Sequence, residues 1–321
     1  MSRVVKYVTL CLVLLLFAGT AHAFHADSFR NKDVALNSTI PASLSVQVGV
    51  VNGEARELVY EEGKGRKVSE LQWDIDNVVM AGVKGSFDFT DWLSFNGGFW
   101  MNLTGGDDGY MDDYDWLTSD PRWSDWSHSR ITVEKAISVD TNFEIKIFEW
   151  DYLALSGLVG FKFDNWKWED SGGSYVYSIS GWRNSIGNFP ENETGIGYEQ
   201  WFYCPYVGIQ TDSDFGDFKL KTYVKGTIYA WADDEDYHYS RRLVFNDSFS
   251  NIKYLGAGIS GCYSFTQNIF STISVDYQKY YRQVGNVKER STVTGETSSM
   301  SNGAGIDNET LSIGLELGFN F

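Results

Sequence analysis

Two short motifs in this sequence combine residue types and a spacing that could do chemistry. They are Asp113-Tyr114-Asp115 and Asp236-Tyr237-His238. Residues two apart in an extended strand point to the same side, so each motif presents a pair of polar groups together. An Asp beside an imidazole fixes its tautomer and keeps it basic, which makes His238 a candidate general base near neutral pH. The two carboxylates of the first motif could hold a water or bind a cation.

Other interpretations of these motifs exist. The acids from Asp107 to Asp115 could form a calcium loop, although the run lacks the Gly and the terminal Glu of an EF-hand. An Asp-x-His motif taken alone is most often part of a solvated loop. The motifs therefore have to be judged together with the elements that position them.

The last strand is the clearest structural signal. Apolar side chains occupy every second position from Leu311 to Phe321, with small or polar residues between them. This pattern is typical of a strand with lipid on one side and a polar barrel interior on the other, although a soluble sandwich also alternates. The final aromatic residue is similar to the C-terminal signal of bacterial outer-membrane proteins.

The same alternation recurs in residues 43–50 and 218–228. In the second segment Lys219, Lys221 and Lys225 lie opposite the apolar face. A lysine facing lipid at the bilayer midplane costs about 2–4 kcal/mol, so we expect these lysines to face the lumen.

Short breaks near 89–91, 149–151, 212–217 and 265–268 fit tight periplasmic turns. Longer polar stretches at 61–66, 104–128, 178–196, 232–242 and 284–305 fit extracellular loops. Nine connections imply ten strands, and an even number of strands brings both termini of the chain to the periplasmic side. The sequence thus predicts an all-β protein, a ten-stranded antiparallel transmembrane β-barrel extending above the outer membrane.

Composition narrows the compartment and the partners. Residues 1–23 have the basic start, apolar core and Ala21-His22-Ala23 site of a signal peptide, which leaves one domain, 24–321. A net charge of −17 makes nucleic acid an unsuitable partner and favours basic peptides or proteins. Cys204 and Cys262 fall on segments that we expect an intervening strand to separate, so we expect no disulfide.

Several segments, in their order along the chain, resemble the omptins, a family of ten-stranded outer-membrane endopeptidases, over the whole mature chain. The segments are Gly65-Arg66-Lys67-Val68-Ser69 with Trp73, Asp113-Tyr114-Asp115-Trp116, Gly172-Gly173-Ser174-Tyr175-Val176-Tyr177, Ile186-Gly187-Asn188-Phe189-Pro190, Gly195-Ile196-Gly197-Tyr198, Asp236-Tyr237-His238-Tyr239 and Asn302-Gly303-Ala304-Gly305-Ile306.

The resemblance implies an aspartic-type endopeptidase of the bacterial outer membrane, with its active site facing outside and no cofactor or metal. The family's catalytic residues match Asp113, Asp115, Asp236 and His238. The family prefers cleavage between two basic residues. Its substrate-binding residues match Glu57 and Asp234, at the floor of the pocket for the residue before the cut. Asp125 matches the acid that faces the residue after the cut, and Ser127 matches a nearby serine that is not the nucleophile.

This sequence departs from the family pattern on the outer barrel face. Two arginines that bind lipid A phosphates in relatives match Asn165 and Trp201, and phosphate binding needs cations. We therefore expect weaker coupling to lipopolysaccharide as an activator than in relatives: the protein should either be active without it or bind it through other cations, such as Lys162 or Lys167.

One structural requirement follows from residue parity. If the strand from residue 218 runs on unbroken, Asp236 and His238 face lipid, so we expect a bulge or turn near Asp233 to reverse them. The competing function is a catalytically inactive barrel that serves as an adhesin or a structural protein. A barrel phospholipase would need a Ser-His pair, for which we find no candidate.

Overall fold

The computed structural model describes residues 41–104 and 109–321 and contains twelve β-strands. The strands are β1 (Ala42–Tyr60), β2 (Lys67–Thr90), β3 (Leu93–Asn102), β4 (Tyr110–Asp115), β5 (Asp125–Glu149), β6 (Leu153–Tyr177), β7 (Ser185–Asn188), β8 (Ile196–Asp214), β9 (Phe218–His238), β10 (Leu243–Ser264), β11 (Ile269–Ser291) and β12 (Thr297–Asn320). No helix in this part of the chain could cross a membrane. The expected signal peptide, residues 1–23, lies outside the described residues, as do Asp107 and Asp108 of the calcium alternative.

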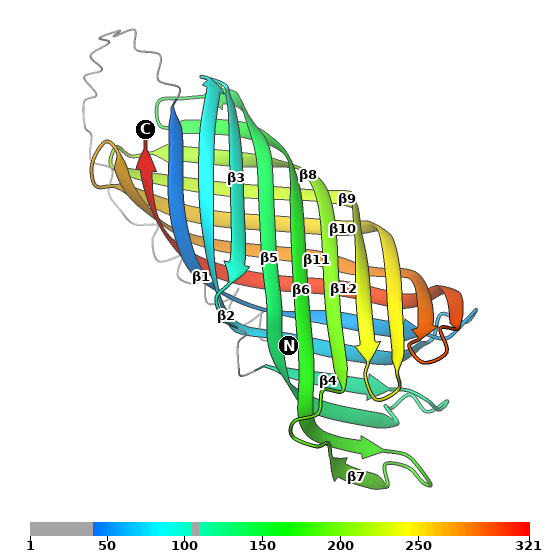
Figure 1. Ribbon diagram of the computed structural model, residues 1–321. Coiled ribbons are helices and arrows are strands. Elements are labelled where there is room, and N and C mark those ends of the chain that lie inside the picture. The colour runs from blue at the N-terminus through cyan, green and yellow to red at the C-terminus, as the bar shows by residue number, and fades with distance from the viewer. Residues whose placement is uncertain (1–40, 105–108) are drawn as a thin grey trace.

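The twelve strands occupy ten positions around one closed antiparallel sheet (Figure 1). β3 and β4 share a position, because both pair with β2 on one side and with β5 on the other. β7 pairs with β6 alone, and the pairing of β1 with β12 closes the ring. The ten-stranded barrel expected from the sequence is therefore confirmed.

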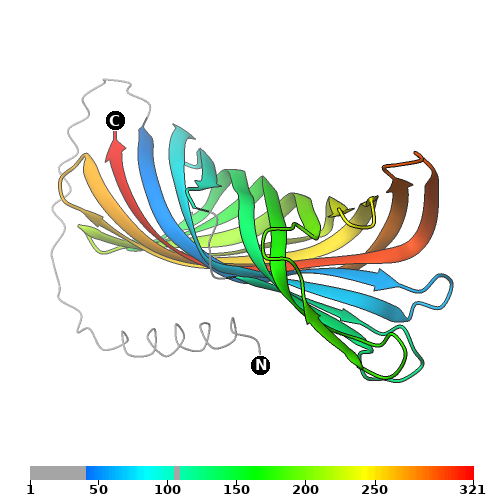
Figure 2. The same ribbon diagram turned by 60° about the horizontal axis from the view of Figure 1, so that its bottom comes forward.

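The two ends of the barrel differ as expected. Four short connections, β2 to β3, β5 to β6, β8 to β9 and β10 to β11, lie at the end where β1 begins and β12 finishes. The hairpins joining β1 to β2 and β11 to β12 lie at the end opposite the C-terminus (Figure 2). Figure 1 shows β4 and β7 at that same end.

Two of the loops at this end are shorter than the sequence predicted. Most of 232–242 and 284–305 is strand, since β9 continues to His238, β11 continues to Ser291 and β12 begins at Thr297. Above the membrane there is no lipid on the outer face, so both faces of a strand carry polar residues. The alternation that marks a strand inside the bilayer is lost there, although the hydrogen-bonded ladder continues.

The barrel wall separates an apolar outer face from a charged interior. Val46, Val207 and Leu315 point outward with more than half of their surface exposed. Inside, Lys84 Nζ lies 2.9 Å from Glu316 Oε2, and the buried Lys225 is ion-paired with Asp140. The expectation that Lys225 faces the lumen is thus confirmed, and the apolar band identifies the membrane-spanning part.

A bulge in β9 reverses which residues face inward. Relative to β10, β9 contains one extra residue between Thr227 and Ala230, so Ile228 and Tyr229 both point outward. Beyond this point the odd-numbered residues, such as Trp231, are exposed, and the even-numbered ones are buried. The expected bulge that turns Asp236 and His238 inward exists, but it lies at residues 227–230, so the predicted position near Asp233 is wrong. No Gly, Pro or Asp marks residues 227–230, so the sequence offers no local signal for this bulge.

The two cysteines of the barrel wall are unpaired thiols, as expected. Cys204 lies on β8 and Cys262 on β10, and β9 runs between these strands.

Candidate active site

The expected site residues gather at the end of the barrel opposite the start of β1 and the end of β12. They are Glu57 on β1, Asp113 and Asp115 on β4, Asp125 and Ser127 on β5, and Asp234, Asp236 and His238 on β9. On β1, Glu57 follows Val50, the last exposed apolar residue of the strand, by seven positions. At a rise of about 3.3 Å per residue this is roughly 20 Å along the strand, so the site lies beyond the apolar band.

His238 and Asp236 form a close pair. His238 Nε2 lies 2.6 Å from Asp236 Oδ2, and the Asp236 side chain is almost fully buried. A carboxylate can only accept, so Nε2 carries the hydrogen and Nδ1 is left as an acceptor. The ring of Phe245 packs edge-on against the imidazole, with centroids 5.5 Å apart, and holds its orientation. This geometry keeps one imidazole nitrogen available as a base.

Asp113 and Asp115 form the second acidic pair. Ser69 Oγ donates to Asp113 Oδ1 at 3.2 Å. Burial raises the pKa of Asp113 well above its usual range, and the charge of Asp115 raises it further. Burial also raises the pKa of Asp115, while the Ser69 hydrogen bond, Arg241 and His238 oppose this. The influence of His238 on Asp115 shows that β4 and β9 bring the two motifs to one site.

Glu57 and Asp234 lie in a fully buried polar cluster. The Tyr198 hydroxyl donates to Asp234 Oδ2 at 2.8 Å, and Gln200 Nε2 donates to that hydroxyl at 3.0 Å. Burial, reinforced by neighbouring carboxylates, raises the pKa of both Glu57 and Asp234 well above the usual range. These groups are therefore poised to ionise when a cation enters.

Asp125 and Ser127 are buried on β5, on the same face as each other. Asp125 Oδ1 accepts a hydrogen bond from the Ser178 backbone N–H at 2.8 Å. Ser127 hydrogen-bonds with Tyr177, and burial raises the pKa of Tyr177 to about 12. Within the described residues no hydrogen bond links Ser127 to a histidine, so the arrangement does not resemble an activated serine nucleophile.

Sequence reasoning missed two acids of this site. Asp170 on β6 accepts hydrogen bonds from the Gly195 and Ile196 backbone N–H groups, at 2.8 and 2.7 Å, and lies close enough to His238 to interact electrostatically. Asp247 on β10 lies directly opposite Asp234 of β9 in the register of the two strands. Asp247 would have been found had the turn at 239–242 been recognised as a tight hairpin, because such a hairpin sets the two acids opposite each other.

The outer wall over β5, β6 and β8 carries the departures from the family pattern. Asn165 pairs with Trp201 across β6 and β8, and Asn165 Nδ2 donates to Glu199 Oε1 at 2.9 Å. Lys135 Nζ lies 2.8 Å from the same Glu199 oxygen. Lys167 Nζ lies 3.6 Å from Glu169 Oε1. The lysines of this wall are thus paired with acids of the wall itself.

The expectation that Lys162 serves as an outer-face cation is wrong. Lys162 is buried inside the barrel, where its Nζ lies 2.9 Å from Asp164 Oδ1 and 2.6 Å from Ser138 Oγ. Its neighbours Phe161 and Phe163 point the opposite way, because side chains alternate across a strand.

Known proteins resemble the chain over almost its whole length. The Omptin family model matches residues 38–321. The chain is 30% identical over 313 residues to the plasminogen activator of Yersinia pestis, covering 96% of this chain and 97% of that protein. It is 29% identical over 292 residues to protease 7 of Escherichia coli O157:H7, covering 88% and 91%. The crystal structure of the outer membrane protease OmpT from Escherichia coli superposes with a TM-score of 0.84 at 27% identity, covering 88% of this chain and 97% of that one.

Proposed function

This chain belongs to the omptin family and is an outer-membrane protease, and we propose that it is an aspartic-type endopeptidase that cleaves peptides and proteins at or between basic residues. The observation that carries the proposal is the His238–Asp236 pair, 2.6 Å apart, at one site with the acids Asp113 and Asp115. A base and a pair of coupled carboxylates together can activate water and stabilise the charge that develops on the carbonyl.

Water is the nucleophile in this mechanism. His238 Nδ1 takes a proton from a water as its oxygen attacks the peptide carbonyl carbon, and Asp236 stabilises the imidazolium that forms. Asp113 and Asp115 share a proton, because two close and buried carboxylates seldom both ionise. Their protonated member donates to the carbonyl oxygen, and the ionised member orients the water.

Collapse of the tetrahedral intermediate completes the reaction. The bond from carbon to nitrogen breaks, and the imidazolium of His238 returns its proton to the departing amine. The carbonyl oxygen returns its proton to the acid pair, so His238 and the carboxylates regain their starting states. No covalent bond between the protein and the substrate forms at any stage.

Specificity comes from acids that accept hydrogen bonds from cationic side chains. Glu57 and Asp234 bind the basic residue before the cut, and Asp125 faces the residue after it, with Ser127 beside it. The overall charge of −17 draws basic substrates toward the site. Replacing Glu57 by Gln should lower kcat/KM for Arg before the cut more than for a neutral residue there.

Lipopolysaccharide is at most a weak activator in this proposal. The outer wall has Asn165 and Trp201 where relatives have cations, and Lys135 and Lys167 are already paired with acids. Outer-membrane lipid still surrounds the apolar band of the barrel.

The test uses the full mature chain refolded in detergent and two quenched peptides that differ only in an Arg-Arg or a Gln-Gln pair. We expect cleavage of the first peptide, located by mass spectrometry between or beside the arginines, and at least a tenfold loss when Asp113 is replaced by Asn. A folded barrel that cleaves neither peptide would favour the competing function, an inactive adhesin or structural barrel.

A further inference from the structure

We propose that Asp247 is a third carboxylate of the pocket for the basic residue before the cut, acting beside Glu57 and Asp234 as a specificity-determining residue. The inference rests on the proposed function, because it needs a cationic side chain to enter this pocket. Three observations support it: the register of Asp247, its burial with an unpartnered Oδ1, and the lack of any ion pair to the three carboxylates among the described residues.

The register places Asp247 against the pocket. Asp247 on β10 lies directly opposite Asp234 on β9. Side chains directly opposite in an antiparallel pair have Cβ atoms about 4.5–5.5 Å apart, and like charges in that relation are destabilising. Such a pair persists only if protons or a cation neutralise it.

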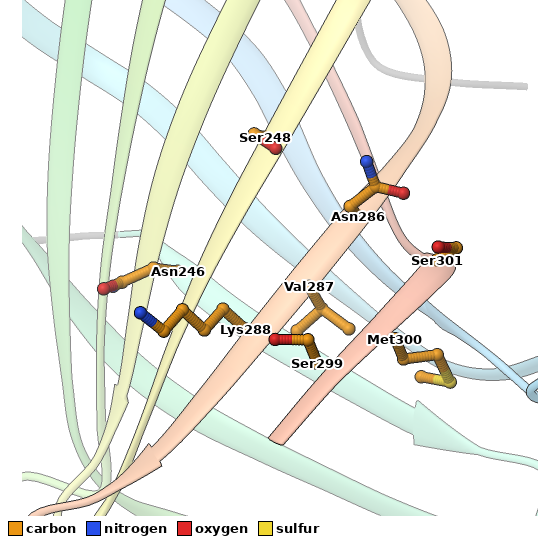
Figure 3. Close-up of a pocket in the computed structure, with 8 residues that line it drawn as sticks. All are labelled: Asn246, Ser248, Asn286, Val287, Lys288, Ser299, Met300 and Ser301. Carbon is orange, nitrogen blue, oxygen red and sulfur yellow. The ribbon is translucent and has the colours of Figure 1, made fainter. Parts of the chain in front are cut away.

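The neighbours of Asp247 on the same strand confirm which way it points. Asn246 and Ser248 are exposed and, with residues of β11 and β12, line a depression of about 300 Å³ on the outer side of the sheet (Figure 3). Asp247, between them, is only 7% exposed. Alternation along the strand therefore directs it into the barrel, toward the acids of β9.

The carboxylates of this cluster have unused acceptor atoms. Asp247 Oδ1, Asp234 Oδ1 and Glu57 Oε2 are buried and have no hydrogen-bond partner in the described part of the chain. Among the ion pairs of residues 41–104 and 109–321, none involves any of these three side chains. Burying an ionised carboxylate without a partner is costly, so these carboxyls either keep their protons or ionise against a cation that enters the site.

The occupant that fits is a substrate side chain. An ammonium offers three N–H donors and a guanidinium five, and the three side chains offer one free buried oxygen each. In the described residues no group of His, Cys, Asp or Glu side chains is arranged to hold a metal ion. Tyr198 occupies the other oxygen of Asp234 and leaves Oδ1 for the incoming cation.

The surrounding groups also explain why the acids tolerate each other in the free protein. Burial first, and then the neighbouring Asp236, raises the pKa of Asp247 to about 8. Asp234 and Asp236 on β9 and Glu57 on β1 are the other acids of this cluster, and Asp233 on the outer face of β9 adds a smaller effect on Asp234. Entry of a cation would favour the ionised forms and release protons from the pocket.

The test compares Asp247→Asn with wild type in the refolded full chain, using quenched peptides with Arg, Lys or Gln before the cut. We expect kcat/KM for Arg and Lys to fall about 10- to 100-fold, mainly through KM, with less than about a threefold change for Gln. Asp233→Asn is the matched control, since Asp233 is on β9 but exposed on the outer face, and it should leave all three substrates unchanged.

The outcomes separate the inference from the function on which it rests. Suppose that wild type cleaves Arg peptides. If Asp247→Asn then changes kcat/KM for the Arg and Gln peptides by the same factor, or does not lower kcat/KM for the Arg peptide, Asp247 is not in the pocket. If wild type does not distinguish Arg from Gln, the proposed specificity itself fails. Competitive inhibition by methylguanidinium, weakened in Asp247→Asn, provides a second measurement that does not depend on which residue of the peptide stands before the cut.

Discussion

The hydrogen bond between His238 and Asp236 gives the sharpest test of the mechanism. Asp236 is 2% exposed and accepts from His238 Nε2 at 2.6 Å. When His238 takes the proton of water, this contact becomes a charge-assisted hydrogen bond, worth about 1.5–3 kcal/mol. One factor of ten in rate corresponds to about 1.36 kcal/mol, so Asp236→Asn should lower kcat by about 10- to 150-fold.

The same reasoning predicts how two substitutions combine. Removing the base in His238→Ala should lower kcat by about 10²–10⁴. Because the contribution of Asp236 to the chemical step is made through His238, the double variant should have a kcat no lower than that of His238→Ala alone, within about threefold. Independent actions would instead multiply the two losses.

The assay is steady-state cleavage of the Arg-Arg peptide by refolded protein, with folding checked by the heat-dependent mobility of the barrel on gels. Tyr237→Phe is the control, because Tyr237 lies between the two residues but points to the other face, where its ring contacts Tyr239 at 4.4 Å between centroids. A double variant slower than His238→Ala by the full factor of Asp236→Asn would refute the view that Asp236 works through the imidazole.

Three further outcomes are expected. Lys225→Met should destabilise the barrel by about 3–5 kcal/mol in urea unfolding, since it leaves the partly buried Asp140 without its ion pair. A change below about 1 kcal/mol would show that the Tyr206 hydroxyl, 2.6 Å from Asp140, is sufficient as its partner. The pKa of Asp247 is about 8 in the folded protein and 3.8 ordinarily, so the folded state keeps a proton that the unfolded state releases, and stability should fall as pH rises from about 4 to 8. Asp247→Asn should therefore raise the thermal midpoint at pH 8 and not at pH 4, and an equal change at both would contradict the assignment. Wild type should cleave peptides in pure detergent. The double variant with Lys135→Ala and Lys167→Ala should lose any stimulation by added lipopolysaccharide. An absolute requirement for lipopolysaccharide that persists in this double variant would refute this description of the outer wall.

The sequence alone determined the barrel, because the bilayer imposes a local pattern. A strand between lipid and a polar lumen must alternate, and the residues from Leu311 to Phe321 do so without exception. The four short turns follow from the same pattern. Above the membrane this constraint ends, which is why β9, β11 and β12 run on through segments that the sequence suggested were loops.

The chemistry of the site was also partly local. The pairing of Asp236 with His238 needs only two positions of one strand, so its spacing was sufficient to predict it. The same alternation around Phe161 and Phe163 places Lys162 inside the barrel, although we had expected it to replace the missing arginines as an outer-face cation.

Only the tertiary structure decided which groups from distant strands meet. Asp115 and His238 are more than a hundred residues apart and come together through the closure of the sheet, while Asp247 faces Asp234 through the register of β9 and β10. A single extra residue between Thr227 and Ala230 turns His238 inward. Each bulge reverses every side chain beyond it, so the face of a residue depends on pairing along the whole strand, and that pairing is fixed by neighbouring strands rather than by local sequence.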